Sequence, residues 1–369
     1  MTQKIKIAVV GAGHLGRFHA RLLAKHPAYE LKAVVDPSVT ARESVAQEVS
    51  VRSYDSCEAL LTHEELQAAV IASPTKYHFT LAESLIQAGK HLLIEKPLAS
   101  DLSQAESIVA AASDKKCVLQ VGHIERFNPA LGKVYSEVTQ PTYIDAKRMG
   151  GYSFRSTDIG VVFDLMIHDV DVVLSILKSK PKNIEAVGVC VMGPQEDIAT
   201  ARMRFEGGCI VNLTASRVSE EVERKMHVWT PQCFVEVDYA AGHTRWTRPA
   251  DAMKLQQHKN AEQLSTEEKR EAQGRFFDEW LKTEQVDVES RNALEDELTD
   301  FARAINTGAR VQVDGAAGRD AIAVCEQILE NMTQVRWESA KSNADQPVVS
   351  PATTASLLRS QAVEHRRAG

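Results

Sequence analysis

The sequence predicts an α/β protein of two domains, an N-terminal doubly wound parallel sheet of the Rossmann type and a second domain that combines helices with another sheet. Three observations predict this fold. The chain has 369 residues, and domains usually run to roughly 100–200 residues, so about two are expected. Strands alternate with helices as far as residue 121, which is typical of a parallel sheet. Beyond Phe127 several strands follow one another directly, which indicates an antiparallel or mixed sheet.

The first domain is predicted from a regular series of strands and helices. Residues 5–10 form a short β-rich run, as expected of a buried parallel strand. Helical periodicity follows over 14–25, and a second strand is predicted over 31–35. Asp101 and Gln104 resemble a capping box at the start of a later helix. The other strands are predicted at 68–71, 91–94 and 117–121, with helices that begin near Tyr77 and Asp101.

The second domain begins where this pattern changes. A helix is predicted from about Phe163 to Leu177, and residues 245–290 are polar, which favours an exposed loop or a helical insertion. Beyond residue 342 the chain is rich in Ser, Ala, Pro and Thr and is expected to be disordered. Strands are predicted at 142–147, 184–192, 199–205, 209–216, 225–230 and 234–239, and helices at 129–136, 295–306 and 318–332. The expected domains are a nucleotide-binding domain over 1–124, a substrate and oligomerisation domain over 125–338, and a tail over 339–369.

Composition excludes several classes of protein. Hydrophobic residues make up 44% and charged residues 25% of the chain, as in an ordinary globular protein. The net charge of -7 argues against a nucleic-acid surface. The sequence lacks an apolar stretch of the ~20 residues that a membrane span needs, and its N-terminus lacks the features of a signal peptide. The six cysteines are scattered without a CxxC, which favours reduced thiols in the cytoplasm over disulfides or a zinc site.

A glycine motif lies between the first predicted strand and the first helix. It has the pattern GxGxxG and consists of Gly11, Ala12, Gly13, His14, Leu15 and Gly16. In such a motif the first glycine permits a tight turn, the second lets the backbone approach a pyrophosphate, and the third lets helix and strand pack closely. Asp36, at the end of the next strand, is placed to accept both adenosine ribose hydroxyls and to repel a 2′-phosphate. The pattern therefore predicts NAD rather than NADP; the alternative is a glycine-rich turn with a solvated aspartate.

Glu95, Lys96 and Pro97 follow the strand predicted over 91–94. The carboxyl end of a strand in an open α/β sheet faces the ligand crevice. A lysine there lowers the cost of a developing alkoxide or donates to a carbonyl oxygen, and the fixed φ of Pro97 would help to aim it. The alternative interpretations are a solvated Lys96 and a structural role for Glu95.

Asp164 and His168 are four residues apart on a predicted helix and therefore share one face. Histidine titrates near neutrality, so it suits the removal of a hydroxyl proton as hydride leaves carbon. The carboxylate would raise its basicity or hold the same substrate. The alternative is an ordinary contact on a helix surface. No metal site is predicted, because the chain offers no third ligand of matching spacing.

The segment 122–129 lies at the end of the last parallel strand. Arg126 and Asn128 are candidates to hold a polar or anionic group of the substrate. The alternative is a linker in which Asn128 starts a helix. Weaker candidates for the same task, including arginines that would suit a diphosphate, are Tyr152, Arg148 and Arg155.

Taken in order, these motifs resemble the Gfo/Idh/MocA family of glucose–fructose oxidoreductase, inositol dehydrogenase and rhizopine-catabolism proteins. The motifs are the GxGxxG, Ser73-Pro74-Thr75 with His78, Glu95-Lys96-Pro97, and the Asp164–Asp169 segment. The resemblance covers roughly residues 4–335. It implies a Rossmann domain plus a domain on a large, open, mostly antiparallel sheet, whose face packs in homodimers or homotetramers.

The resemblance also assigns roles to residues. It implies that Lys96 and His168 are catalytic and flank the substrate carbinol, with Asp164 alongside. Further cofactor contacts are implied for Ser73, Pro74, Thr75, His78, Glu95 and Lys96. From the residues alone, His14, His19 and His78 are interpreted instead as packing or helix-end residues.

Within the family, segment 122–129 is similar to that of bacterial UDP-N-acetylglucosamine 3-dehydrogenases. This likeness implies an enzyme that oxidises the 3-hydroxyl of a nucleotide sugar with NAD. Two alternatives stay open: a dehydrogenase of inositol, a free sugar or a sugar acid, and a non-catalytic NAD(H)-binding protein. The second alternative needs no aligned Lys96 and His168, so their presence favours an enzyme.

Overall fold

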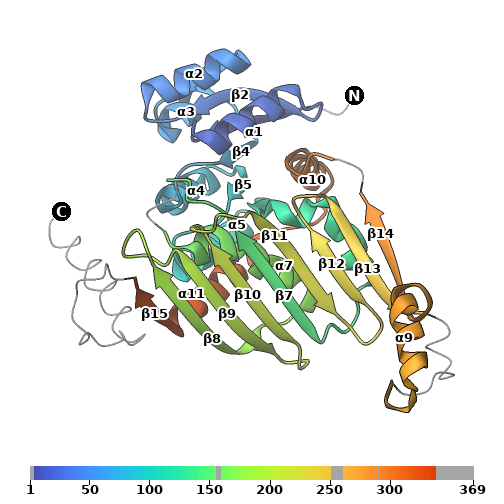
Figure 1. The fold of residues 1–369 in the computed structure, drawn as a ribbon. Helices are drawn as coiled ribbons and strands as arrows, with labels where there is room; N and C mark the ends of the chain where they lie inside the picture. The colour runs from blue at the N-terminus through green and yellow to red at the C-terminus, as the bar shows by residue number, and fades with distance from the viewer. Residues whose placement is uncertain (1–3, 155–158, 251–260, 289–290, 338–369) are drawn as a thin grey trace, which may run out of the picture. The chain divides into compact units, whose positions relative to one another are not determined.

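The computed structural model describes residues 4–154, 159–250, 261–288 and 291–337. The chain divides into two compact units (Figure 1). Unit 1 comprises residues 1–127, 170–175 and 291–327, and unit 2 comprises 128–169, 176–290 and 328–369. The predicted boundary after residue 124 lies close to the end of the first segment of unit 1. The prediction had, however, placed residues 291–327 in the second domain.

Unit 1 is built on a six-stranded parallel sheet in the order β3-β2-β1-β4-β5-β6. This is the strand order of the doubly wound dinucleotide-binding fold. The predicted strands are therefore confirmed, and a short strand, β3, was missed. The strands are β1 (Ile5–Val10), β2 (Tyr29–Val35), β3 (Arg52–Tyr54), β4 (Ala68–Ile71), β5 (His91–Glu95) and β6 (Leu119–Gly122).

The helices of unit 1 include two from the far end of the chain. Those that alternate with the strands are α1 (His14–Lys25), α2 (Val39–Val49), α3 (Cys57–His63), α4 (His78–Gln87) and α5 (Leu102–Asp114); the late helices are α10 (Ala293–Thr307) and α11 (Gly315–Glu330). Asp101 caps α5, because its Oδ1 accepts a hydrogen bond of 2.8 Å from the backbone N–H of Gln104. Phe301 of α10 is fully buried in one core with residues of α1, β1, β2 and β4. Burial of such a side chain contributes about 1.5–3 kcal/mol, so α10 is part of the nucleotide-binding fold.

Unit 2 is built on a nine-stranded mixed sheet in the order β14-β13-β12-β11-β7-β10-β9-β8-β15. Pairs β7–β10 and β8–β15 are parallel and the other neighbours are antiparallel, as the resemblance implied. The strands are β7 (Tyr143–Met149), β8 (Pro181–Cys190), β9 (Ile198–Phe205), β10 (Ile210–Ser216), β11 (Glu223–Trp229), β12 (Phe234–Asp238), β13 (His243–Pro249), β14 (Leu281–Asp287) and β15 (Met332–Arg336).

The polar region 245–290 differs from the prediction of a loop or helical insertion. Its two ends form β13 and β14, which pair along their whole length. Between them lies α9 (Thr266–Arg275), whose N-cap Ser265 makes a capping box with Glu268. The sequence did not predict these strands because β14 is exposed along most of its length and therefore lacks the apolar residues of a buried strand. The predicted tail over 339–369 lies outside the described residues.

The helix predicted over 163–177 begins differently from an ordinary α-helix. Residues Val162–Met166 form a π-helical turn that continues directly into α7 (Ile167–Leu177). Single π turns inside helices are rare and are frequent at functional sites. Among the described helices, none combines the length and apolar character that a membrane crossing requires.

Candidate active site

The glycine loop of unit 1 has the geometry that its sequence predicts. Gly11 has a φ of +106°, and a Cβ there would lie 2.6 Å from the backbone of Ala72. At Gly16 a Cβ would lie 1.8 Å from the carbonyl oxygen of Gly11, so only glycine lets α1 approach β1 this closely. At Gly13 a Cβ would meet nothing within 4 Å. The backbone beside Gly13 is therefore open to an approaching ligand.

The N-terminus of α1 is suited to a diphosphate. Gly13 is the N-cap, no side chain caps the helix, and its first turn carries no acidic residue. Gly13, His14 and Leu15 are exposed, whereas Ala12 is buried. The first N–H groups of a helix and its positive dipole end together bind anions. The loop therefore offers backbone donors that no side chain within it occupies.

Asp36 lies beside the glycine loop, directly after β2. Its Oδ2 accepts 2.8 Å from the N–H of Ala12, and its Oδ1 accepts 2.8 Å from the N–H of Ser38. These bonds fix the carboxylate and leave each oxygen a second lone pair, which suits two ribose hydroxyls. The chain therefore fits the adenosine end of NAD.

The loop after β4 is held to the Lys96 loop by a histidine. The ring of His78 bonds to the carbonyl oxygens of Ser73 and Pro97 at 2.8 and 2.9 Å. Burial lowers the pKa of His78, and the two carbonyl bonds oppose that effect. Its ring nitrogens serve the backbone of two segments, which matches the packing role inferred from the residues. Thr75 begins a short 3₁₀ turn in this loop, and Pro74 is exposed.

Lys96 directly follows β5, at the carboxyl edge of the parallel sheet, and is half-buried. Its neighbour Glu95 is buried, and Glu95 Oε1 lies 2.7 Å from His19 Nε2. The side chain of Glu95 is thus engaged with α1, which corresponds to the structural alternative given for it. Lys96 therefore stands on a strand end whose last side chain is fixed inside the unit.

His123 follows β6 at the same edge of the sheet. Its side chain is buried, and neither ring nitrogen has a hydrogen-bond partner among the described residues. Burial lowers the pKa of His123; the charge of Asp171 opposes this effect and that of Lys96 reinforces it. His123 is therefore a neutral imidazole near Lys96, and the sequence motifs did not single it out.

In unit 2, Asp164 lies in the π turn and His168 in the first turn of α7. Both side chains are half-buried. The N–H of Asp164 bonds to the carbonyl oxygen of Gly160 at 3.0 Å, so the turn is held from its first residue. Both predicted residues thus lie on one continuous helical segment.

The acidic residues that follow His168 each hold an arginine. Asp169 makes a two-bond contact with Arg148, at 3.0 Å to Nε and 2.9 Å to Nη2, and both residues are buried. The prediction that Arg148 serves a diphosphate is therefore wrong, because its charge is already paired inside unit 2. Asp171 lies 3.4 Å from Nη1 of Arg126 in unit 1.

Arg126 has a second internal partner, the carbonyl oxygen of Gln312 at 3.3 Å. Asn128 accepts 3.0 Å from the N–H of Ala130 and caps a short 3₁₀ helix, as in the linker interpretation. Tyr152 lies under the guanidinium of Arg217, 5.2 Å from its ring centre. Arg155 lies outside the described residues.

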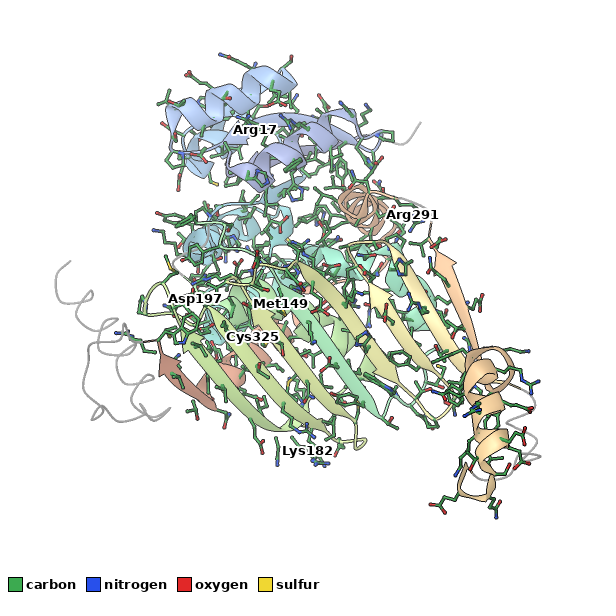
Figure 2. The ribbon with its side chains drawn as sticks, viewed as in Figure 1. Arg17, Met149, Lys182, Asp197, Arg291 and Cys325 are labelled. Carbon is green, nitrogen blue, oxygen red and sulfur yellow. The ribbon has the colours of Figure 1, made fainter. Side chains whose placement is uncertain are left out.

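A buried cluster holds the segment before the π turn. Glu196 Oε1 accepts 3.1 Å from the N–H of Val162, and a Cβ on Gly160 would overlap that carboxylate. Burial raises the pKa of Glu196, and the Val162 bond opposes that effect. Arg217 bonds to Asp197 at 2.7 Å and to the carbonyl oxygen of Ile159 at 2.8 Å. Figure 2 shows Asp197 and Met149 at the same end of the sheet of unit 2.

Comparisons with known proteins agree with this architecture. A family described as "Oxidoreductase family, NAD-binding Rossmann fold" matches residues 5–123, and the GFO/IDH/MocA C-terminal domain matches 130–233. The UDP-N-acetylglucosamine 3-dehydrogenase of Acidithiobacillus ferrooxidans is 34% identical over 325 residues, which cover 88% of this chain and 96% of that protein. The chain belongs to the Gfo/Idh/MocA family.

Solved structures support the same assignment. The Acidithiobacillus enzyme superimposes with a TM-score of 0.78 at 33% identity, over 90% of this chain and 98% of that one. Levoglucosan dehydrogenase in complex with NADH and levoglucosan has a TM-score of 0.74 at 17% identity, over 89% and 97% of the two chains, and shows the shared fold. The protein is thus a Gfo/Idh/MocA oxidoreductase with an NAD-binding Rossmann fold.

Proposed function

We propose that this protein oxidises a secondary hydroxyl of a nucleotide-activated amino sugar, with UDP-N-acetylglucosamine at C3 as the specific substrate. The observation that carries the proposal is the similarity to the Acidithiobacillus 3-dehydrogenase across nearly the whole of both chains. The resemblance of segment 122–129 to that subgroup supports the same substrate. Similarity to a scyllo-inositol 2-dehydrogenase of Bacillus subtilis is lower, 26% over 236 residues.

The chemistry divides between three side chains. His168 removes the proton of the substrate hydroxyl, Lys96 stabilises the alkoxide by charge, and Asp164 supports the histidine or holds the same substrate. Bound NAD supplies the acceptor for the hydride. This assignment rests on the family motifs, and it fits the position of Lys96 at the carboxyl edge of the sheet.

The proposal also assigns substrate contacts. Arg126, Asn128, Tyr152 and Arg155 are proposed to contact the sugar nucleotide. Arg126 and Asn128 already have internal partners, so a substrate contact would add to those bonds. Assembly as a homodimer or homotetramer in the cytoplasm also belongs to this proposal, as the family resemblance implies.

The test is a screen for NADH formation with UDP-N-acetylglucosamine, other UDP-sugars, free N-acetylglucosamine and myo-inositol. We expect the UDP-amino sugar to be oxidised most efficiently, and product analysis to place the new carbonyl at C3. The Lys96→Met variant is the control for background oxidation. NADH formation with myo-inositol and with no UDP-sugar would reject the substrate. No turnover on any of them, with normal NAD binding, would favour a non-catalytic NAD(H)-binding protein.

A further inference from the structure

A cluster of three buried side chains lies within unit 1, beside Lys96 in the sequence. His19 comes from α1, Glu95 from the end of β5 and Glu297 from α10. His19 and Glu297 are fully buried, and Glu95 is 8% exposed. One nitrogen or carboxylate oxygen from each residue lies within 4.8 Å of the others. Elements distant in the sequence therefore bring two acids and one base together.

Neighbouring residues leave room for the two carboxyl side chains. A Cβ on Gly122 would lie 2.8 Å from Oε2 of Glu95, so the glycine in segment 122–129 makes room for this carboxylate. Gln120 Nε2 donates 3.0 Å to the backbone carbonyl oxygen of Glu297. Both carboxyl oxygens of Glu297 are buried without a hydrogen-bond partner among the described residues. Glu297 is thus a buried acid with neither a cation nor a donor bound to it there.

The charges that face the two acids differ. Burial opposes ionisation of Glu95, but the bond and charge of His19, and the charges of Lys96 and His78, outweigh it and lower the pKa of Glu95. Burial raises the pKa of Glu297 well above its usual range, and the charges of Glu95 and Asp300 add to that rise. Two neighbouring buried carboxyls do not both ionise, because the second charge finds no compensation.

A metal ion would also neutralise the cluster, but the geometry disfavours it. Metal–ligand distances of about 2.0–2.2 Å at near-tetrahedral angles keep ligand atoms more than about 3 Å apart. His19 Nε2 and Glu95 Oε1 are 2.7 Å apart, the distance of a direct hydrogen bond. The pair is closed to an ion between them.

We propose that Glu297 keeps its proton at neutral pH, so that no second negative charge opposes the ionised Glu95 carboxylate, which His19 holds at the strand end on which Lys96 is positioned. His19, Glu95 and Glu297 are positioning residues, since they act through the strand end that carries the lysine. The consequence for catalysis rests on the proposed role of Lys96. The protonation of Glu297 does not, so the two are tested separately.

Infrared spectroscopy tests the proton directly. A protonated carboxyl has a C=O stretch distinct from the carboxylate bands. We expect this band at neutral pH in the wild-type protein and its loss in Glu297→Gln, with no loss in Glu295→Gln, which removes an exposed acid from the same helix. Absence of a band assignable to Glu297, or one equivalent of bound metal in the purified protein, would overturn the proposal.

The pH dependence of stability gives a second readout, and its sign is fixed. The pKa of Glu297 is raised in the folded protein, so the folded state binds this proton more tightly than the unfolded chain. The stability that the proton contributes is fully present at low pH and is lost as pH rises. The melting temperature of Glu297→Gln relative to wild type should therefore increase steadily from about pH 5 to about pH 8. A constant difference over that range would contradict the proposal.

Activity separates positioning from folding. Glu297→Ala and Glu95→Gln should lower kcat by about tenfold to a hundredfold, the range expected from a small misplacement of a catalytic group. NAD affinity should change little, and Glu297→Gln should recover most of the kcat lost in Glu297→Ala. If Glu297→Ala and Glu297→Gln lost kcat equally, the positioning role of Glu297 would be rejected. A carboxyl band without turnover on any substrate would instead reject the proposed function.

Discussion

The charged groups buried at the end of β5 and those buried in unit 2 are neutralised in opposite ways. In unit 2, Asp169 is matched by Arg148, and Asp197 by Arg217. In unit 1 the Glu95 cluster contains two carboxyls, one imidazole and no guanidinium. The first arrangement is neutral through permanent charges, because arginine does not lose its proton in proteins. The second arrangement needs a titratable proton.

This difference predicts opposite responses to pH. Burial opposes ionisation of Asp197, but bonds from the N–H groups of Met192 and Val191 and from Arg217 outweigh it and lower its pKa. Its contribution to stability is therefore present at neutral pH and is lost in acid. The contribution of Glu297 has the opposite sign and is lost as pH rises.

Each unit also contains a group of the other kind: the pKa of Glu196 in unit 2 is raised like that of Glu297, and the pKa of Glu95 in unit 1 is lowered like that of Asp197. We therefore expect the opposite responses to be seen at the single residues, in the variants Glu297→Gln and Asp197→Asn, rather than in whole units.

The largest effect is expected at the proposed catalytic pair, which draws one residue from each region. Lys96→Met and His168→Asn should each lower turnover by roughly 10²–10⁴, the size of general acid–base contributions, while NAD affinity stays nearly intact. Steady-state kinetics and calorimetric NAD titration measure the two quantities. Asp164→Asn should lose less if Asp164 only supports His168. Near-wild-type turnover in both main variants would remove these residues from the mechanism.

The second largest effect is expected at the buried ion pair next to His168. Arg148→Met removes the guanidinium that makes two hydrogen bonds to the buried Asp169 carboxylate, and breaking such a buried pair should cost about 3–5 kcal/mol of unfolding free energy. Chemical denaturation measures the loss. Adding Asp169→Leu should recover a large part of it, because the double variant buries no charge. If the double variant were no more stable than Arg148→Met, the pair would not be the source of the loss.

Local patterns in the sequence were sufficient for the parallel sheet and the cofactor loop. The roles of Gly11, Gly13 and Gly16 depend on backbone geometry that a few adjacent residues determine. The order of motifs also predicted Lys96 and His168 as candidates. These residues lie on the strand end and the helix that the sequence predicts.

Interactions between distant segments could not be predicted in this way. Glu297 lies 202 positions after Glu95 in the numbering, and its helix belongs to unit 1 although the sequence predicts it in the second domain. The sequence predicted a diphosphate contact for Arg148 because its partner Asp169 lies 21 residues away in the chain. Three acids, Asp164, Asp169 and Asp171, occur in one apolar helical segment. Acids that become buried need partners, so this run indicated that cations would pair with them.

A smaller effect is expected at Arg126. Arg126→Ala should lower the melting temperature, because Asp171 is buried and would lose its cation. If the proposed substrate contact exists, the variant should also raise KM for UDP-N-acetylglucosamine by about tenfold to a hundredfold, the loss of one charged hydrogen bond. KM for free N-acetylglucosamine serves as the control. Lower stability with unchanged KM would leave Arg126 with its internal role alone.

The smallest effect concerns cofactor choice. Wild type should bind NAD more tightly than NADP, because the Asp36 carboxylate accepts ribose hydroxyls and repels a 2′-phosphate. Asp36→Ala should lower the ratio of NAD to NADP affinity by about tenfold, which corresponds to about 1.4 kcal/mol.

Arg42 lies close to this site. Its Nη1 donates to the carbonyl oxygens of Asp36 and Pro37 at 3.3 and 3.1 Å.

With the Asp36 carboxylate removed, Arg42, whose guanidinium already lies at the backbone of Asp36 and Pro37, should pair with the 2′-phosphate. In an Arg42→Met background, Asp36→Ala should therefore weaken NAD binding without improving NADP binding. Calorimetry with both cofactors on the two single variants and the double variant completes the cycle. The alanine substitution also removes the acceptor for the N–H groups of Ala12 and Ser38, so melting temperatures of the same variants separate loop disorder from lost recognition. NADP binding as tight as NAD binding in the wild type would show that Asp36 does not select the cofactor.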